Sequence, residues 1–142
     1  MSKSIKLKNN TYWDSTSITH NKELLSTKVI NSSGSNSNGS WIKFEDGTMI
    51  CRMKKEYSVV FKSSQKWGIL WESDLVSLGN FPTQFKTIPS VNVTICSSSS
   101  GLIEYVLNTT TSFAGQVQMF RPIDTNGTLT YTMSVVAIGT WK

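Results

Sequence analysis

Two tryptophans and their polar neighbours are the residues in this sequence best suited to bind a small molecule. Trp67 and Trp71 follow a polar segment at 62–66, and Glu72 and Asn80 come shortly after them. Small-ligand sites combine an apolar wall with a few polar groups, and a sugar in particular offers a C–H face and hydroxyls. These four residues are therefore the candidate carbohydrate-binding residues. The alternative is that both tryptophans are core or interface residues, because tryptophan is usually well buried.

Catalytic groups are sparse. Glu72 and Asp74 stand two residues apart, on one face of a strand, and glycoside hydrolysis needs two carboxyl groups about 5–10 Å apart. Nine acidic residues in 142 produce such pairs by chance, however. The single histidine, His20, has no nucleophile signature around it. We therefore expect no catalytic residues and a protein that is not an enzyme, with a polysaccharide depolymerase as the minor alternative.

No cofactor or metal is expected. Two cysteines and one histidine contain no close pair of ligands for a tetrahedral metal site, and no glycine-rich phosphate loop is present. The N-terminus lacks the apolar segment of a secretory signal, which indicates a reducing compartment. Cys51 shares a strand face with Met49 and Met53, whereas Cys96 lies on the polar side of its strand. This difference favours two free thiols over a disulfide.

Composition bounds the fold class and the partners. The 142 residues correspond to one domain, with only 16% charged but 11% aromatic residues and many Ser and Thr. This balance argues against disorder and favours strands. The net charge is +5, but only two of the 14 basic residues are Arg and they form no stripe, so we expect no nucleic-acid partner. No apolar run approaches about 18 residues, so we expect no membrane insertion.

Three segments follow one another along the chain. Residues 1–30 begin with a short alternating stretch suited to an edge strand, and residues 21–30 have the apolar stripe of a short helix, so they form an N-terminal attachment or oligomerisation segment. Residues 31–40 contain only Ser, Asn and Gly, which predicts a flexible linker. Residues 41–142 form the third segment, a β-sandwich domain.

Turn residues recur every 8–12 positions in this third segment, which is typical of a sandwich or barrel. Asp46-Gly47 predicts a hairpin turn between a strand at 41–44 and one at about 49–61. A polar loop is expected at 62–66, and further strands at about 67–71, 75–78, 90–96, 102–108, 116–121 and 128–141. The predicted fold class is all-β, an antiparallel β-sandwich of about six or seven strands with a short N-terminal strand or helix appendage.

Some strands have apolar residues on both faces. The last strand alternates clearly from Leu129 to Ala137, but its polar face becomes apolar at Val136 and Ile138, and Phe120 is similarly placed on its own strand. A lone sandwich keeps its outer face polar. A second apolar surface therefore predicts a subunit interface.

Several motifs resemble a known family. Residues 38–51 read NGSWIKFEDGTMIC, and they are followed by WG at 67–68, LGNFPTQF at 78–85, a proline at 89 and AIGTWK at 137–142. This order resembles a C-terminal domain of tail-fibre or receptor-binding proteins in phages and prophages of Gram-positive bacteria. Residues 5–28 are similar to the N-terminal stretch of small tail-fibre-like phage proteins.

The resemblance implies an H-type-lectin-like β-sandwich that assembles as a homotrimer at the distal tail of the virion, after synthesis in the bacterial cytoplasm. It implies three kinds of partner: further copies of the chain, other phage tail or baseplate proteins, and a host cell-surface polysaccharide. It transfers no binding residues. The leading hypothesis is a non-enzymatic receptor-binding protein, and the alternative is a structural tail or baseplate component without a ligand.

Overall fold

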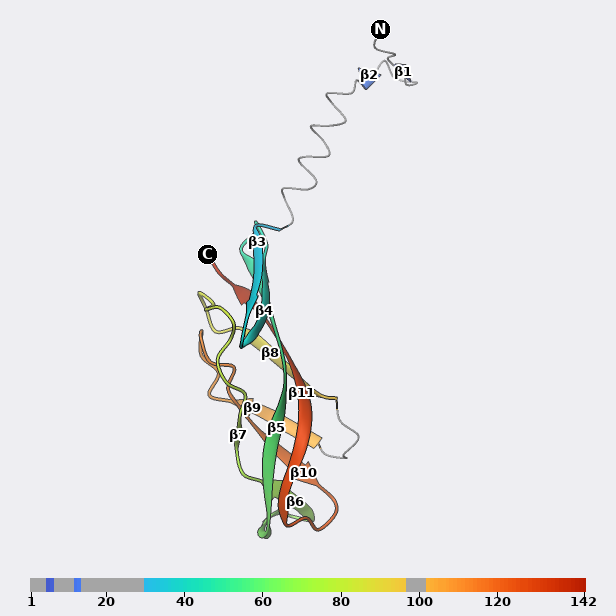
Figure 1. Ribbon diagram of the computed structural model, residues 1–142, viewed down its shortest axis with the longest axis vertical. Helices are drawn as coiled ribbons and strands as arrows, with labels where there is room; N and C mark the ends of the chain where they lie inside the picture. Colours follow the sequence, from blue (N-terminus) through green and yellow to red (C-terminus); the bar gives the residue numbers. More distant parts are fainter. Residues whose placement is uncertain (1–4, 7–11, 14–29, 97–101) are drawn as a thin grey trace.

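The computed structural model describes residues 5–6, 12–13, 30–96 and 102–142, and this part of the chain is all-β, without a helix (Figure 1). Two very short strands, β1 (Ile5–Lys6) and β2 (Tyr12–Trp13), pair with each other. The other nine form one antiparallel sheet: β3 (Ser32–Asn36), β4 (Gly39–Lys43), β5 (Thr48–Trp67), β6 (Leu70–Ser73), β7 (Val76–Ser77), β8 (Ser90–Ile95), β9 (Leu102–Leu107), β10 (Gln116–Arg121) and β11 (Gly127–Thr140).

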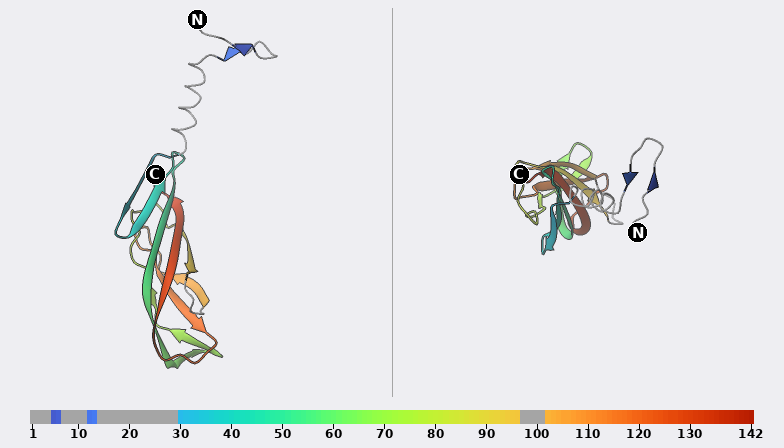
Figure 2. Two further views of the ribbon diagram at one scale, coloured as in Figure 1. Left: turned by 45° about the vertical axis from the view of Figure 1, so that its right-hand side comes forward. Right: turned by 90° about the horizontal axis from the view of Figure 1, so that it is seen from above.

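The 20-residue strand β5 organises this sheet. All 14 residues of β11 pair with it, from Thr48 opposite Thr140 to Phe61 opposite Gly127. The other edge of β5 pairs first with β4 and then with β6. The two long strands therefore run side by side along the molecule (Figures 1 and 2).

The sheet folds over to form two layers around one core. Strands β3, β4, β5, β11 and β8 make one layer, and β6, β7, β9 and β10 make the other. Inward side chains of β5 and β11 alternate with exposed ones, as the period of two requires. They pack against β10, β7 and the loops at 78–85 and 114, and the buried set includes Met49, Cys51, Met53, Val59, Phe61, Leu78, Phe85, Val117, Met119, Tyr131, Met133 and Val135. The predicted β-sandwich is thus confirmed.

The predicted hairpin at Asp46-Gly47 is present. The Asp46 side chain accepts a hydrogen bond from the Thr48 amide at 2.8 Å, and this bond lowers the pKa of its carboxyl group. Gly47 has a φ of 95°, which a residue with a Cβ rarely adopts. The turn therefore follows from the local sequence.

Residues 31–40, expected to be a flexible linker, are instead β3 and the first residues of β4. Gly34 lies opposite Trp41, whose ring packs so closely that an added Cβ would lie 2.4 Å from it. Asn36 also donates a hydrogen bond to the Pro82 carbonyl at 2.8 Å. Glycine is required at position 34, because only a residue without a Cβ fits under the Trp41 ring. The division of the chain into three domains stays a prediction, and the expected helix at 21–30 lies almost wholly outside the described residues.

The expected polar loop at 62–66 was wrong: these residues continue β5. The register shifts between Phe61 and Lys66, because Phe61 lies opposite Ser73 while Lys66 lies opposite Trp71. Three residues of β5 therefore bulge out of the ladder. The segment is polar because it is largely exposed, not because it turns.

Both cysteines are free, as predicted. Cys51 is buried with its neighbours Met49 and Met53, and this burial raises the pKa of its thiol to about 11. Cys96 is exposed at the end of β8. Within the described ranges, no helix has the length and hydropathy needed to cross a membrane.

Candidate functional site

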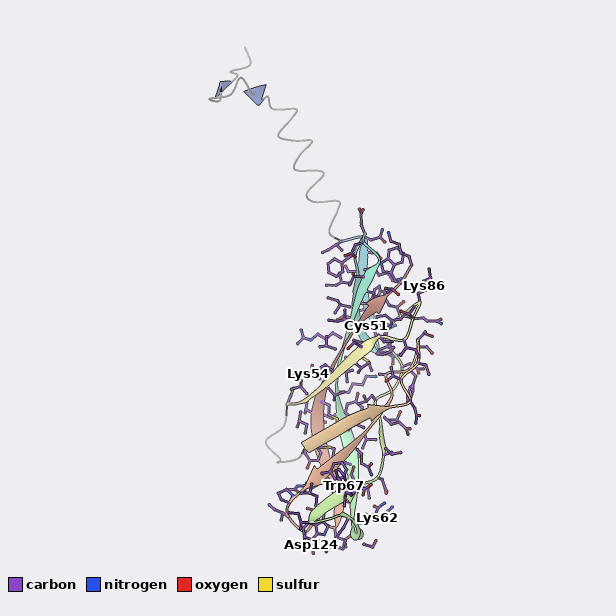
Figure 3. The ribbon with its side chains drawn as sticks, turned by 180° about the vertical axis from the view of Figure 1, so that it is seen from behind. Cys51, Lys54, Lys62, Trp67, Lys86 and Asp124 are labelled. Atoms are coloured by element: carbon purple, nitrogen blue, oxygen red, sulfur yellow. The ribbon has the colours of Figure 1, made fainter. Side chains whose placement is uncertain are left out.

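The turn between β5 and β6 lies at the end of the sandwich opposite the chain termini of the described body. Asn31 bonds to the Lys43 carbonyl and Trp141 to the Gly47 carbonyl, so both termini meet the start of β5. The β5–β6 turn follows the far end of that strand (Figure 1). This far end is hereafter called the tip. Figure 3 places Trp67, Lys62 and Asp124 there, away from Lys86.

A glycine shapes the turn at the tip. Trp67 lies opposite Leu70, so only Gly68 and Ile69 connect the two strands. Gly68 has a φ of 63°, and a two-residue hairpin with Gly at its first central position is a type II′ turn. This turn places Trp67 and Ile69 at the extremity of the molecule, where these residues are 57% and 85% exposed.

The outer face of the β5–β6–β10 tip carries an aromatic pair. The rings of Trp67 and Phe120 have centroids 5.4 Å apart and planes tilted by 55°. Phe120 is nearly fully buried but lies outside the core cluster. The predicted second-face position of Phe120 is thus covered, in part, by Trp67 of the same chain. Trp67 in turn is held in place while more than half of its surface stays exposed.

A polar pair lies beside these rings. Glu72 is directly opposite Phe120 in the β6–β10 ladder, so their side chains share a face. The Gln118 amide nitrogen donates a hydrogen bond to the Glu72 carboxylate and another to the Ser73 carbonyl at 3.0 Å. Glu72 is thereby oriented beside Trp67. We call the four residues Trp67, Glu72, Gln118 and Phe120 the tip patch.

Trp71 lies on the opposite face of β6 from Glu72. Its ring has the Lys66 ammonium 4.4 Å from its centroid, a cation–π contact. Its indole Nε1 is buried and has no hydrogen-bond partner among the described residues. Trp71 therefore borders the tip patch without joining it, and it is half-buried.

The two carboxylates considered for catalysis have separate partners. Asp74 accepts a hydrogen bond from Lys62 at 2.8 Å, and this contact lowers the pKa of its carboxyl group. Glu72 is bound by Gln118. Each group is thus held by a neighbour within the chain.

Asn80 lies elsewhere. It pairs with Phe113 in an isolated bridge beside the N-terminal end of β10, whereas Glu72 pairs with Phe120 near the C-terminal end of that strand. The six residues of β10 span roughly 17 Å. The structure therefore brings Trp67 and Glu72 together, keeps Trp71 nearby and separates Asn80 from all three.

Two residues of the tip patch were not among the candidates. Gln118 and Phe120 come to Glu72 through pairing of strands 46 or more residues apart in sequence. The register between such distant strands cannot be predicted from a local sequence pattern. For Phe120, one indication was present in the sequence, its apolar side chain on the outer face of its strand.

The described part of the chain contains no group of three or more His, Cys, Asp or Glu residues that could hold a metal ion. The tip patch offers an aromatic surface, a carboxylate and an amide. Groups of these kinds can contact a polar ligand that also has a C–H face.

Comparison with known proteins gives little more. No protein-family model matches the chain. No curated protein matches it. Among solved structures, the N-truncated R1-type pyocin tail fiber is 12% identical, with a TM-score of 0.47, over 94% of this chain and 99% of that chain. A C-terminal fragment of the P. aeruginosa R1 pyocin fiber is 16% identical, with a TM-score of 0.43, over 76% of this chain and 27% of that one.

The chain thus spans about a quarter of the longer pyocin fragment. Both TM-scores lie below 0.5, so these likenesses carry no argument about function.

Proposed function

We propose that the protein is a non-enzymatic tail-fibre or receptor-binding protein of a phage or prophage, and that its tip patch recognises a carbohydrate on the host surface. The observation that carries this proposal is Trp67, which stays 57% exposed although it is fixed against Phe120. A rigid, exposed indole is suited to stack on the C–H face of a sugar ring. An exposed aromatic without a ligand is costly, since it leaves a large apolar surface in water.

The polar groups beside Trp67 complete a lectin-like arrangement. Gln118 uses its amide nitrogen on Glu72 and on the Ser73 carbonyl, so the carboxylate is already oriented in the absence of ligand. A preorganised acceptor loses little entropy on binding. Glu72 is therefore the group that we assign to sugar hydroxyls, next to the indole of Trp67.

The tip location fits attachment to a host. The described termini lie at one end of the sandwich and the tip patch at the other (Figure 1). A fibre held by its N-terminal segment, through further copies and other tail or baseplate proteins, would present the tip outward. The motifs at 38–51, 78–85 and 137–142 support the tail-protein context.

Avidity is expected to supply the strength of attachment. A single patch of four residues is expected to bind weakly, whereas three patches on a homotrimer would bind a repeating polysaccharide with avidity, because the second and third contacts are intramolecular. We propose this arrangement on the virion tail, with the chain in the bacterial cytoplasm before assembly.

The test is binding to host cells and to isolated cell-wall polysaccharide by purified full-length protein. Trp67→Ala should lower the affinity at least tenfold, and Glu72→Gln should lower it severalfold. Ile88→Ala is the matched control, because Ile88 is 65% exposed in a loop away from the tip. Wild-type binding that survives Trp67→Ala unchanged would exclude the tip patch as the receptor site.

A protein that binds no host glycan at all would favour the structural alternative, a tail component without a ligand. Release of reducing ends from the polysaccharide would instead indicate a depolymerase, and Glu72→Gln should then abolish the release. The separate partners of Glu72 and Asp74 favour binding over turnover.

A further inference from the structure

The tip patch holds two groups that together suit a positive charge. Trp67 lies opposite Leu70 in the β5–β6 ladder, so its side chain shares a face with Glu72, two residues farther along β6. Diagonal neighbours of this kind are about 7–8 Å apart. A small group can therefore contact the indole face and the carboxylate at the same time. We propose that the glycan recognised by the tip patch carries a protonated amine, which binds between Trp67 and Glu72; this inference rests on the proposed function and names the class of sugar.

The ring of Trp67 lacks the cation that other indoles of this chain have. The Lys66 ammonium lies 4.4 Å from the Trp71 ring centroid, and two lysines lie 5.3 and 5.4 Å from that of Trp141. Trp67 is more than half exposed, yet no Lys or Arg of the described residues makes such a contact with it. An ammonium within about 6 Å of an indole centroid is attracted by the negative face of the ring. The exposed part of Trp67 is therefore suited to a cation from outside the chain.

Glu72 supplies the negative charge on the same face. Lys62 is bound to Asp74 at 2.8 Å, and this is the only ion pair that the described residues form, so Glu72 has no cation of that part of the chain against it. Gln118 donates to one oxygen of the Glu72 carboxylate, and the other oxygen can accept from a ligand. An ammonium group only donates, and its hydrogen bond to a carboxylate is roughly twice as strong as one between neutral groups.

This local charge opposes the charge of the whole chain. The net charge of +5 favours a negatively charged polysaccharide at long range. Arg121 does not reverse the charge of the tip patch, because it lies opposite Trp71 and so belongs to the other face of the β6–β10 ladder. A negatively charged sugar seated on Trp67 would lie against the Glu72 carboxylate, and like charges in contact are costly. A preference for a cationic sugar would therefore come from the tip patch and not from the net charge.

The experiment measures binding of the full-length protein to one isolated cell-wall polysaccharide of the host, prepared in two forms. One form is native, and the other is N-acetylated with acetic anhydride, which turns each primary ammonium into a neutral amide. Acetylation should lower the affinity of the wild type at least tenfold. Glu72→Gln should bind the native form severalfold more weakly and should respond much less to acetylation, because the charge that the ammonium contacts is gone.

Glu45→Gln is the matched control, because it removes the same charge from an exposed residue of the turn between β4 and β5, away from the tip. It should retain the wild-type response to acetylation. Equal affinities of the wild type for both forms, with binding still lost in Trp67→Ala, would overturn the inference and leave the proposed function in place. A response to acetylation that persists in Glu72→Gln would also overturn it, since the amine would then bind elsewhere. Failure of the wild type to bind either form would refute the proposed function as well.

Discussion

Ser73 is a fully buried polar residue whose removal should have a measurable effect on both stability and the tip patch. Its hydroxyl accepts a hydrogen bond from the Met119 amide at 3.0 Å and donates one to the Asp74 carbonyl at 2.8 Å. Met119 lies opposite the gap between the end of β6 and the start of β7, where β10 has no backbone partner on that side. The Ser73 side chain therefore replaces a missing bond of the ladder.

The variant Ser73→Ala leaves the buried Met119 amide without this acceptor. An unsatisfied buried amide costs about 1–3 kcal/mol. The free energy of unfolding should fall by that amount, and with a urea m-value of about 2 kcal/mol/M the midpoint should fall by roughly 0.5–1.5 M. Because β10 also carries Gln118 and Phe120, the fluorescence of Trp67 should change as well.

The assay is urea unfolding, with every variant measured at the same protein concentration, because assembly makes the apparent stability depend on concentration. Ser58→Ala is the control, since Ser58 faces outward on β5 and should shift the free energy by no more than about 0.5 kcal/mol. If Ser73→Ala behaves like Ser58→Ala, the Met119 amide finds another acceptor, and the assigned role of the hydroxyl is wrong.

Two further predictions concern the layer formed by β3, β4, β5, β8 and β11. With a thiol reagent at pH 8, Cys96 should react within minutes while Cys51 stays protected, because Cys51 is buried and the pKa of its thiol is raised to about 11. Cys96→Ser should abolish the fast phase of labelling. Rapid labelling of both thiols in the folded protein would contradict the burial of Cys51. Gly34→Val should destabilise the β3–β4 hairpin by about 1–3 kcal/mol, because its Cβ would lie 2.4 Å from the Trp41 ring. Gly34→Val in a Trp41→Ala background should cost clearly less, measured by thermal unfolding, and equal costs in both backgrounds would exclude the clash as the cause.

Local patterns predicted most strands of the body. The alternation of apolar and polar residues from Leu129 to Ala137 identifies the buried face of that strand, and Asp46-Gly47 identifies a turn. Both patterns are complete within a few residues, so they can be recognised without knowledge of the rest of the fold. The strands at 90–96, 102–108 and 116–121 were predicted to within one residue of β8, β9 and β10.

Predictions failed where composition and context disagree. The Ser, Asn and Gly of residues 31–40 are typical of a linker, but Gly34 is required by the ring of Trp41, seven positions later. Residues 62–66 are polar like a loop, but the turn is formed by Gly68 and Ile69, and Gly68 has the positive φ that a two-residue hairpin requires. In both places, pairing across strands overrides the local preference.

The candidate site was predicted only in part, for a related reason. Trp67, Trp71 and Glu72 stand close in sequence, so their proximity in a hairpin was foreseeable, and so were the opposite orientations of the adjacent strand residues Trp71 and Glu72. Gln118 comes next to Glu72 only because of the register in which β10 pairs with β6. Asn80 lies apart from them because it pairs with Phe113, beside the other end of β10. Such long-range register is set by the packing of the whole core.

The tip patch lies far from the end of β5 that the described termini meet, because β5 spans roughly 36 Å from Ile50 to Phe61 before it reaches the tip. Effects at sites this far apart, with no shared partner, are expected to be additive. Trp67→Ala should therefore lower the affinity of each tip while the mass of any assembly stays the same.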